Sequence, residues 1–307
     1  MEGVTTRLAR RAREIRRSRK RTLVIASVVA AAMAAGPLAA QPVLADHEDE
    51  ERWARATWVD DLNFLAANAL LGGLTAGISS RLRGGSFSEA FARGALGGGV
   101  TYLGKRTAAA RFDGAGLLGR EVGAVGASIV RNAGLGIPVL DTLVLPLGPL
   151  RAFVPTGEPA RARVRVDAND VAWLVSALAH DRLTLDWGES ASAGAPVFRA
   201  SGWLRARGDT ASGQHSAGLV LVSDLPPVEV DDVLAHERAH LLQTDFFEIA
   251  VAYPLEDALG RWMGLDESPV LRAIVPGVAY YPVLAPFYGM KRSRSPLEVE
   301  ADFLETR

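Results

Sequence analysis

The stretch from Val233 to Phe247 constrains this chain most, because it contains no proline or glycine and follows two aspartates. Acidic residues favour the positive end of a helix dipole, so the pattern predicts a helix that begins near this point. On that helix His236 and His240 lie one turn apart and leave the same face. Two histidines at this spacing can bind one zinc ion, and Glu237 between them can act as a base toward a metal-bound water. The alternative is a solvated helix whose two histidines bind no metal.

A tetrahedral zinc site needs a third protein ligand, and the composition restricts which residue types can supply it. The chain has 307 residues and no cysteine, which excludes thiolate ligands, a disulfide framework and a thiol nucleophile. The third ligand must therefore be a histidine or a carboxylate. Hydrophobic residues make up 49% of the chain, enough to bury a sizeable core in one or two domains.

The N-terminus resembles an export signal. Residues 1–45 contain nine basic residues and two glutamates, an apolar run from Thr22 to Ala40, and small residues at a cleavage position after Ala45. We expect cleavage there, which places the rest of the chain in the periplasm or cell envelope. An uncleaved signal anchor is the alternative, because the apolar run is just long enough to span a membrane. The remaining chain has 25 basic and 33 acidic residues, which argues against a nucleic-acid partner.

Residues 46–138 form a glycine-rich region in which helices are expected. Residues 53–68 predict a short amphipathic helix, and glycines then punctuate three apolar segments between residues 69 and 136. Ser86 and Glu89 form a capping box before the middle segment. Small residues three or four apart allow close helix packing, in membranes or in soluble domains. Charged residues interrupt the apolar runs, so we expect peripheral membrane contact or an ordinary packed layer rather than membrane spans.

From about residue 139 the pattern changes to an alternation of polar and apolar residues, which is typical of strands. Residues 160–166 place three arginines on one face, which predicts an antiparallel sheet with one wet, basic face. Further strands are expected at the following ranges: 182–187, 197–207 and 217–223. Residues 248–290 are apolar and rich in aromatic residues and proline, too often interrupted for a straight membrane span.

The last stretch, Ser293 to Leu304, contains Glu-Val-Glu-Ala-Asp after a serine-arginine pair. Together with His-Glu-Arg-Ala-His and the preceding strand Leu219 to Ser223, it resembles gluzincin metallopeptidases of the CAAX prenyl protease and heat-shock membrane protease type. The resemblance covers about residues 217–304. It implies a zinc-dependent peptidase core and, by position, Glu298 as third ligand, Asp302 as the residue that supports a ligand histidine, and Glu237 as catalytic base.

Helical geometry agrees with this transfer. Glu298 and Asp302 are four residues apart, so both carboxylates face the same way, one toward metal and one toward a histidine N–H. Glu300 points about 200° around the helix from Glu298, which makes it a poor ligand. We keep Glu300 as the second choice for the third zinc ligand. Two departures from the family matter. Arg238 is a bulky cation that we expect beside the site, and the family's two long membrane helices are missing, which argues against a prenyl-protein substrate.

The sequence thus predicts an α+β protein with a signal peptide or anchor (1–45), a glycine-rich helical region (46–138), and an antiparallel sheet plus metallopeptidase-like domain (139–307). The expected function is an exported zinc-dependent peptidase that hydrolyses peptides or proteins. The alternative is a non-catalytic, membrane-associated envelope protein with a degenerate or structural zinc site. The strand 219–223 is a candidate for pairing with an extended substrate. The sequence does not indicate the oligomeric state.

Some residues have weaker roles in this interpretation. Three tyrosines are candidates for stabilising an oxyanion only because they lie in the aromatic stretch. Of the three remaining histidines, His47 is expected on the flexible mature N-terminus, and His180 and His215 have no partner at ligand spacing. The tyrosines are Tyr280, Tyr281 and Tyr288.

Overall fold

The structure is a computed structural model of the chain, and it describes residues 58–157, 161–180, 182–200, 213–216, 218–223, 227–263 and 295–305. The signal segment, His47 and the three candidate tyrosines lie outside these ranges. The described elements, in chain order, are α3 (Trp58–Leu82), α4 (Phe87–Ala108), α5 (Ala115–Leu135), β1 (Thr142–Leu147), β2 (Leu150–Pro155), β3 (Arg163–Val166), α6 (Ala168–Leu178), β4 (Leu183–Asp186), α7 (Trp187–Ala193), β5 (Val197–Ala200), β6 (Gly213–Ser216), β7 (Leu219–Ser223), α8 (Pro227–Phe247), η3 (Glu248–Ala252), α9 (Tyr253–Met263) and α11 (Pro296–Glu305).

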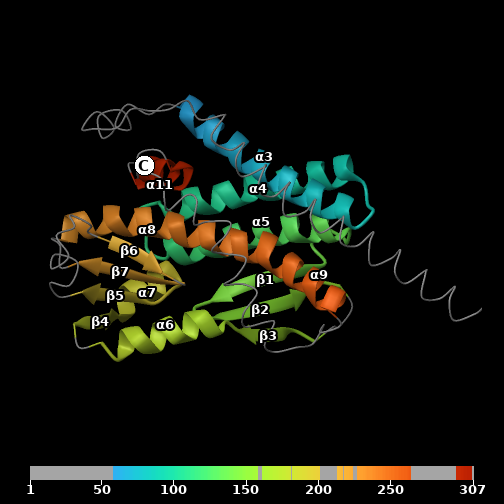
Figure 1. The fold of residues 1–307 in the computed structure, drawn as a ribbon. Helices are drawn as coiled ribbons and strands as arrows, with labels where there is room; N and C mark the ends of the chain where they lie inside the picture. Colours follow the sequence, from blue (N-terminus) through green and yellow to red (C-terminus); the bar gives the residue numbers. More distant parts are fainter. Residues whose placement is uncertain are drawn as a thin grey trace, which may run out of the picture.

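The predicted α+β class is confirmed. Figure 1 shows α3 and α4 above a layer formed by α5 and a long helix composed of α8, η3 and α9, with two small sheets below this layer. The core cluster that includes Ala76, Ala127 and Phe247 joins the glycine-rich helices to α8 and η3. The long helix carries the histidine motif and lies beside α5, which itself packs on β1 through Val144.

The three glycine-rich segments form three closely packed helices. A Cβ added at Gly98 of α4 would overlap the backbone carbonyl of Asn68 in α3, and one at Gly104 would overlap the backbone of α5 at Gly123. Only glycine permits backbones to approach this closely, which explains the composition of the region. The first helix was predicted too short, because α3 continues through its glycines to Leu82 where they face α4.

The predicted capping box before α4 is half formed. Ser86 Oγ accepts the backbone N–H of Glu89 at 3.4 Å. The Glu89 carboxylate does not complete the reciprocal bond in the structure, because it pairs with Arg93 one turn later at 2.6 Å. The hydroxyl cap is sufficient to fix the start of the helix.

The helix predicted from residue 233 begins earlier and extends further, with one π-helical turn. Tyr253 donates its backbone N–H to the carbonyl of Glu248, a five-residue step that replaces the usual four-residue step. This wider turn immediately precedes Pro254, whose ring would otherwise crowd the carbonyl four residues earlier. The π-turn thus allows the chain to continue from α8 into α9 without a break.

The prediction of one antiparallel sheet was wrong in two respects. The described strands form a three-stranded antiparallel sheet, β1-β2-β3, and a separate four-stranded sheet of order β4-β5-β7-β6. In the second sheet β5 and β7 run parallel, with Val197 opposite Val220. Alternation along a strand reports its two faces but not its partners, so the sequence did not reveal the parallel pair.

Both faces of the second sheet are covered by apolar side chains at its centre. Val197, Val220 and Val222 pack against α8, whereas Phe198 and Leu221 form a cluster on the other face with α6. Covering on both faces fixes the position of α8 above the sheet. The strand predicted to pair with substrate, β7, lies between β5 and β6, so both its edges are occupied and that prediction was wrong.

The arginine face predicted for residues 160–166 is only partly present, because Arg161 and Arg163 are exposed but Arg165 is not. Arg165 turns inward, where it donates to Glu256 at 2.6 Å and lies 4.7 Å from the centre of the Tyr253 ring. The alternate residues Val164 and Val166 are 65% and 58% exposed. The ion pair and the cation–π contact compensate the buried guanidinium, so the polar residue occupies the inner face.

A buried cluster of charges holds α8 and η3 against α5 and β2. Arg120 is fully buried and donates to both carboxylate oxygens of Asp245, at 2.6 and 3.1 Å. Arg151 donates to Glu248 at 2.8 Å and to Asp170 at 3.0 Å. Burial raises the pKa of Asp170 to about 8, with Arg151 opposing the rise and Glu248 adding to it. The cluster therefore retains a proton near neutral pH.

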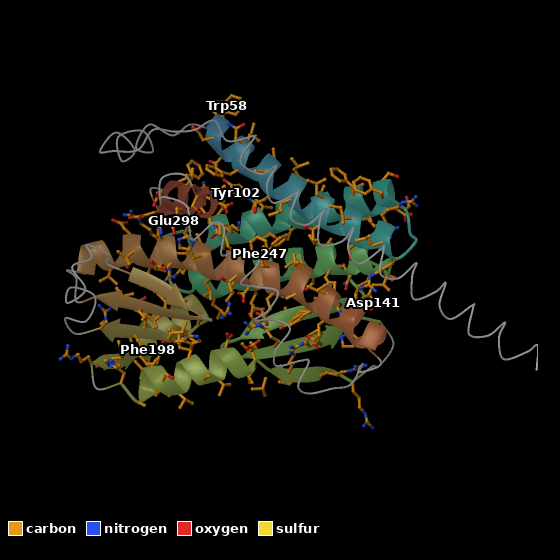
Figure 2. The ribbon with its side chains drawn as sticks, viewed as in Figure 1. Trp58, Tyr102, Asp141, Phe198, Phe247 and Glu298 are labelled. Carbon is orange, nitrogen blue, oxygen red and sulfur yellow. The ribbon has the colours of Figure 1, made fainter. Side chains whose placement is uncertain are left out.

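The outer side of α3 carries exposed apolar side chains. Trp58, Leu62 and Leu70 are 72%, 50% and 48% exposed, and Trp58 lies at the N-terminal end of α3 (Figure 2). Within the described residues, α3 is the one helix long and apolar enough to cross a membrane, and 28% of its most apolar window is buried. Length and composition of this kind are also found in core helices, so they do not establish a membrane span.

Candidate metal centre

The two motif histidines converge on α8. His236 and His240 are buried, with their rings edge to face and the ring centres 4.8 Å apart. Their Nε2 atoms are 3.1 Å apart. Ala235 and Ala239 lie in the contact between α8 and α11, where small side chains leave room for the second helix. The helical spacing thus directs two imidazole nitrogens to one point beneath α11.

Helix α11 brings a carboxylate to the same point. The Oε2 atom of Glu298 lies 3.3 Å from Nε2 of His236 and 3.4 Å from Nε2 of His240. The position of α11 is fixed by packing against α3, where the rings of Phe64 and Phe303 stack with centres 4.6 Å apart. Figure 2 shows Glu298 between α11 and α8.

The three atoms form a nearly equilateral triangle with sides of 3.1, 3.3 and 3.4 Å. Tetrahedral zinc with bonds of about 2.0–2.1 Å separates its ligand atoms by about 3.3 Å. Two imidazole nitrogens and one carboxylate oxygen are also donors that zinc accepts, and three protein ligands leave one position open. The spacing and the chemistry of these donors therefore fit a zinc ion.

The second nitrogen of His236 faces two more carboxylates from α11. Its Nδ1 lies 3.2 Å from Oδ1 of Asp302 and 3.1 Å from Oε2 of Glu305. These three residues form a second set of donor atoms with metal-site spacing, which shares His236 with the first. An N–H on Nδ1 donated to either carboxylate leaves the lone pair on Nε2, directed at the triangle.

The electrostatics of this group favour a cation. Burial would lower the pKa of His236, but hydrogen bonds to Asp302, Glu298 and Glu305 outweigh it and raise that pKa to about 11. Burial would likewise raise the pKa of Glu298, but hydrogen bonds with His236 and His240 hold it well below its usual range. Three carboxylates around two imidazoles thus supply negative charge that a proton or a metal ion can balance.

Two residues of this group had no role in the sequence interpretation. Glu305 is three residues beyond Asp302 and seven beyond Glu298, so helical periodicity alone places it on the same face. Gln243 is three residues beyond His240, and its Oε1 lies 2.9 Å from Nδ1 of that histidine, where it can accept a hydrogen bond. Both could have been found by extending the helical faces of the motif in the C-terminal direction.

Glu300, the second choice for the third ligand, lies on a different face of α11. It is buried, and its carboxylate accepts from Lys105 at 2.6 Å, from Asn68 at 2.6 Å and from Gln243 at 2.8 Å. The donor atoms of the triangle do not include it. The 200° separation from Glu298 explains this placement.

Glu237 is 6% exposed and follows His236 on α8. Its negative charge contributes to the raised pKa of His236, so the two side chains interact electrostatically. Burial and an electrostatic contact with His236 are compatible with a base that acts next to a bound metal, which must also reach the attacking water within hydrogen-bond distance.

Arg238 was expected beside the site, and that expectation was wrong. Its guanidinium lies 3.6 Å from Glu189 and 3.5 Å from Ser192, both on α7. A residue two positions after His236 points about 200° around the helix, away from the face of the histidines. The Arg238 guanidinium therefore lies away from the face that carries the two histidines.

The remaining residues considered from the sequence lie outside α8 and α11. His180 accepts the backbone N–H of Arg182 in a turn, and His215 lies on β6 opposite Val220. The described tyrosines, Tyr102 and Tyr253, donate to Asp61 and Glu248 respectively.

Comparison of the chain with known protein families, with curated proteins and with solved structures finds no match in any of the three.

Proposed function

We propose that this chain is an exported zinc-dependent metallopeptidase that hydrolyses peptide bonds, with zinc held by His236, His240 and Glu298. The observation that carries the proposal is the triangle of donor atoms with sides of 3.1–3.4 Å. A buried glutamate, Glu237, follows the first histidine. A structural site needs four closed ligands, whereas three ligands and an adjacent base suit catalysis.

Each residue has a separate task in this reaction. Asp302 and Glu305 accept the Nδ1 proton of His236 and so keep its Nε2 available as a ligand. When bound, zinc supplies a Lewis acid that polarises the scissile carbonyl and makes water more acidic. Glu237 takes the proton of the attacking water and returns it to the leaving amine.

The resemblance to gluzincins of the CAAX prenyl protease and heat-shock membrane protease type supports the same assignment. Its implied third ligand and histidine-supporting residue, Glu298 and Asp302, are two of the three α11 carboxylates within 3.4 Å of the motif histidines, the third being Glu305. We propose a peptide or protein as the substrate, since none of these features selects a prenyl group.

Zinc content tests the proposal. We expect elemental analysis of the full-length chain to give one zinc per chain, and His240→Ala and Glu298→Ala to lose zinc or bind it more weakly, since each removes one corner of the triangle. His180→Ala is the matched control, because His180 lies in a distant turn, and it should retain zinc. Absence of zinc from folded wild-type protein, or loss of zinc from the control alone, would contradict the proposal.

A second candidate function is a non-catalytic envelope protein that is bound to a membrane and uses zinc structurally. The exposed apolar side chains of α3 favour it, since Trp58, Leu62 and Leu70 follow one helical face. Peripheral membrane contact through α3 is compatible with both functions, and the activity of Glu237 variants distinguishes between them.

The membrane contact has a direct test, because a chain without cysteine can be labelled at one introduced site. We expect an environment-sensitive NBD probe at Leu62→Cys to brighten when vesicles of phosphatidylglycerol and phosphatidylcholine are added. The same probe at Trp187→Cys, a position 78% exposed on α7, should not respond. No response at Leu62, or an equal response at both positions, would exclude α3 as the contact.

A further inference from the structure

A buried polar cluster lies behind His240, where four helices meet. Asn68 of α3, Lys105 of α4, Gln243 of α8 and Glu300 of α11 are each at most 8% exposed. Lys105 Nζ donates to Glu300 Oε2 at 2.6 Å and to Asn68 Oδ1 at 2.9 Å. Asn68 Nδ2 donates to Glu300 Oε1 at 2.6 Å. The cluster contains one cation and one anion, and it ends at the ring of His240.

The orientation of the Gln243 amide follows from its neighbours. One end of the amide faces the Glu300 carboxylate at 2.8 Å and the backbone carbonyl of Leu297 at 3.0 Å. Both of these groups are acceptors, so this end must be the NH₂ group. The other end, Oε1, then faces Nδ1 of His240 at 2.9 Å, and Nδ1 must be the donor.

We propose that Lys105 and Glu300 are positioning residues that fix the tautomer of His240 through Gln243. With Nδ1 protonated, Nε2 of His240 has its lone pair free and directed at the ligand triangle. The use of that lone pair for zinc depends on the proposed function, whereas the tautomer itself does not.

The charges of Lys105 and Glu300 matter because a cluster of neutral side chains would fix the orientation of the Gln243 amide less firmly. A neutral amide at position 300 could rotate to present either an acceptor or a donor to Gln243, so that the Leu297 carbonyl alone would oppose rotation of Gln243. A rotated Gln243 would donate to Nδ1 of His240, and the proton would move to Nε2, where it blocks the metal ligand. A carboxylate cannot donate, and Lys105 keeps Glu300 ionised in a buried position. Buried ion pairs often contribute little net stability, and specifying one arrangement is a role they can have.

The test removes the pair without leaving a buried charge alone. In Lys105→Met/Glu300→Leu we expect zinc affinity, measured by competition with a chelator, to fall about 10–100-fold, the usual effect of losing an outer partner of a metal ligand. Long-range ¹H–¹⁵N correlation spectra of metal-free, neutral His240 should change from the Nδ1–H form to a mixture of both forms. Glu300→Asp retains the charge but withdraws the carboxylate from Gln243, and should give a smaller change in the same direction.

Arg165→Met/Glu256→Leu is the matched control, because it removes another largely buried ion pair at 2.6 Å that does not contact the His240 cluster. It should leave the tautomer and zinc affinity unchanged. If the first double variant and Glu300→Asp both retain the wild-type tautomer and zinc affinity, or if the control changes them equally, the positioning role is wrong. If wild-type protein binds no zinc, the proposed function fails, but the spectra of the metal-free protein still decide the tautomer.

Discussion

Glu237→Gln is expected to lower peptide hydrolysis by about 10²–10⁴-fold, the range typical for removing a general base. The amide has nearly the shape of the carboxylate but cannot take a proton from water. The residue is not a corner of the ligand triangle, so we expect the variant to retain one zinc per chain. Release of fluorescent peptides from labelled casein measures hydrolysis, and elemental analysis on the same samples measures zinc.

Glu89→Gln is the matched control for this substitution. Glu89 lies on α4, where its side chain is 60% exposed and pairs with Arg93. The control should hydrolyse casein at the wild-type rate. Equal hydrolysis by Glu237→Gln and wild type would eliminate the peptidase proposal. Wild-type protein that holds zinc but hydrolyses nothing would favour the non-catalytic envelope protein.

The features of the site that could be predicted from the sequence are those set by residue spacing within a single helix. Four-residue spacing placed His236 beside His240, and it placed Asp302 on the same face as Glu298. That these two faces meet was suggested only by the family resemblance. Their convergence within 3.4 Å depends on the packing of α11 against α3 and α8, which periodicity does not report.

The parts that could not be predicted depend on contacts between residues far apart in the chain. Glu300 meets Lys105 across 195 positions, so its acidic character suggested a ligand, whereas the fold uses it as a buried ion-pair partner. Arg165 shows the same difficulty, because alternation assigned it to a wet face, whereas Glu256 from α9 draws it inward. In both cases the partner determines the face, and a local pattern contains no information about the partner.

Asp245→Ala is expected to destabilise the protein by about 3–5 kcal/mol, because it leaves a buried cation without its carboxylate. Arg120 is fully buried, and Asp245 accepts two of its hydrogen bonds, at 2.6 and 3.1 Å. A second guanidinium, that of Arg151, lies 3.6 Å from the same Asp245 carboxylate. Denaturant unfolding followed by circular dichroism measures the loss. Because Asp245 lies at the end of α8, we expect zinc affinity to decrease together with stability.

Asp232→Ala is the control, since its 2.6 Å pair with Arg111 is solvent-exposed and should contribute about 1 kcal/mol or less.

The pH dependence of the free energy of unfolding gives a second test. The raised pKa of Asp170, about 8, means that the native state holds more protons than the unfolded state between about pH 4 and 8, so wild-type stability falls as pH rises there. Asp245 contributes to that raised pKa, so its removal should make this fall shallower and the cost of Asp245→Ala largest at the acidic end of the range. A cost similar to that of Asp232→Ala, or one that grows with pH, would show that the cluster does not hold its charges as the structure indicates.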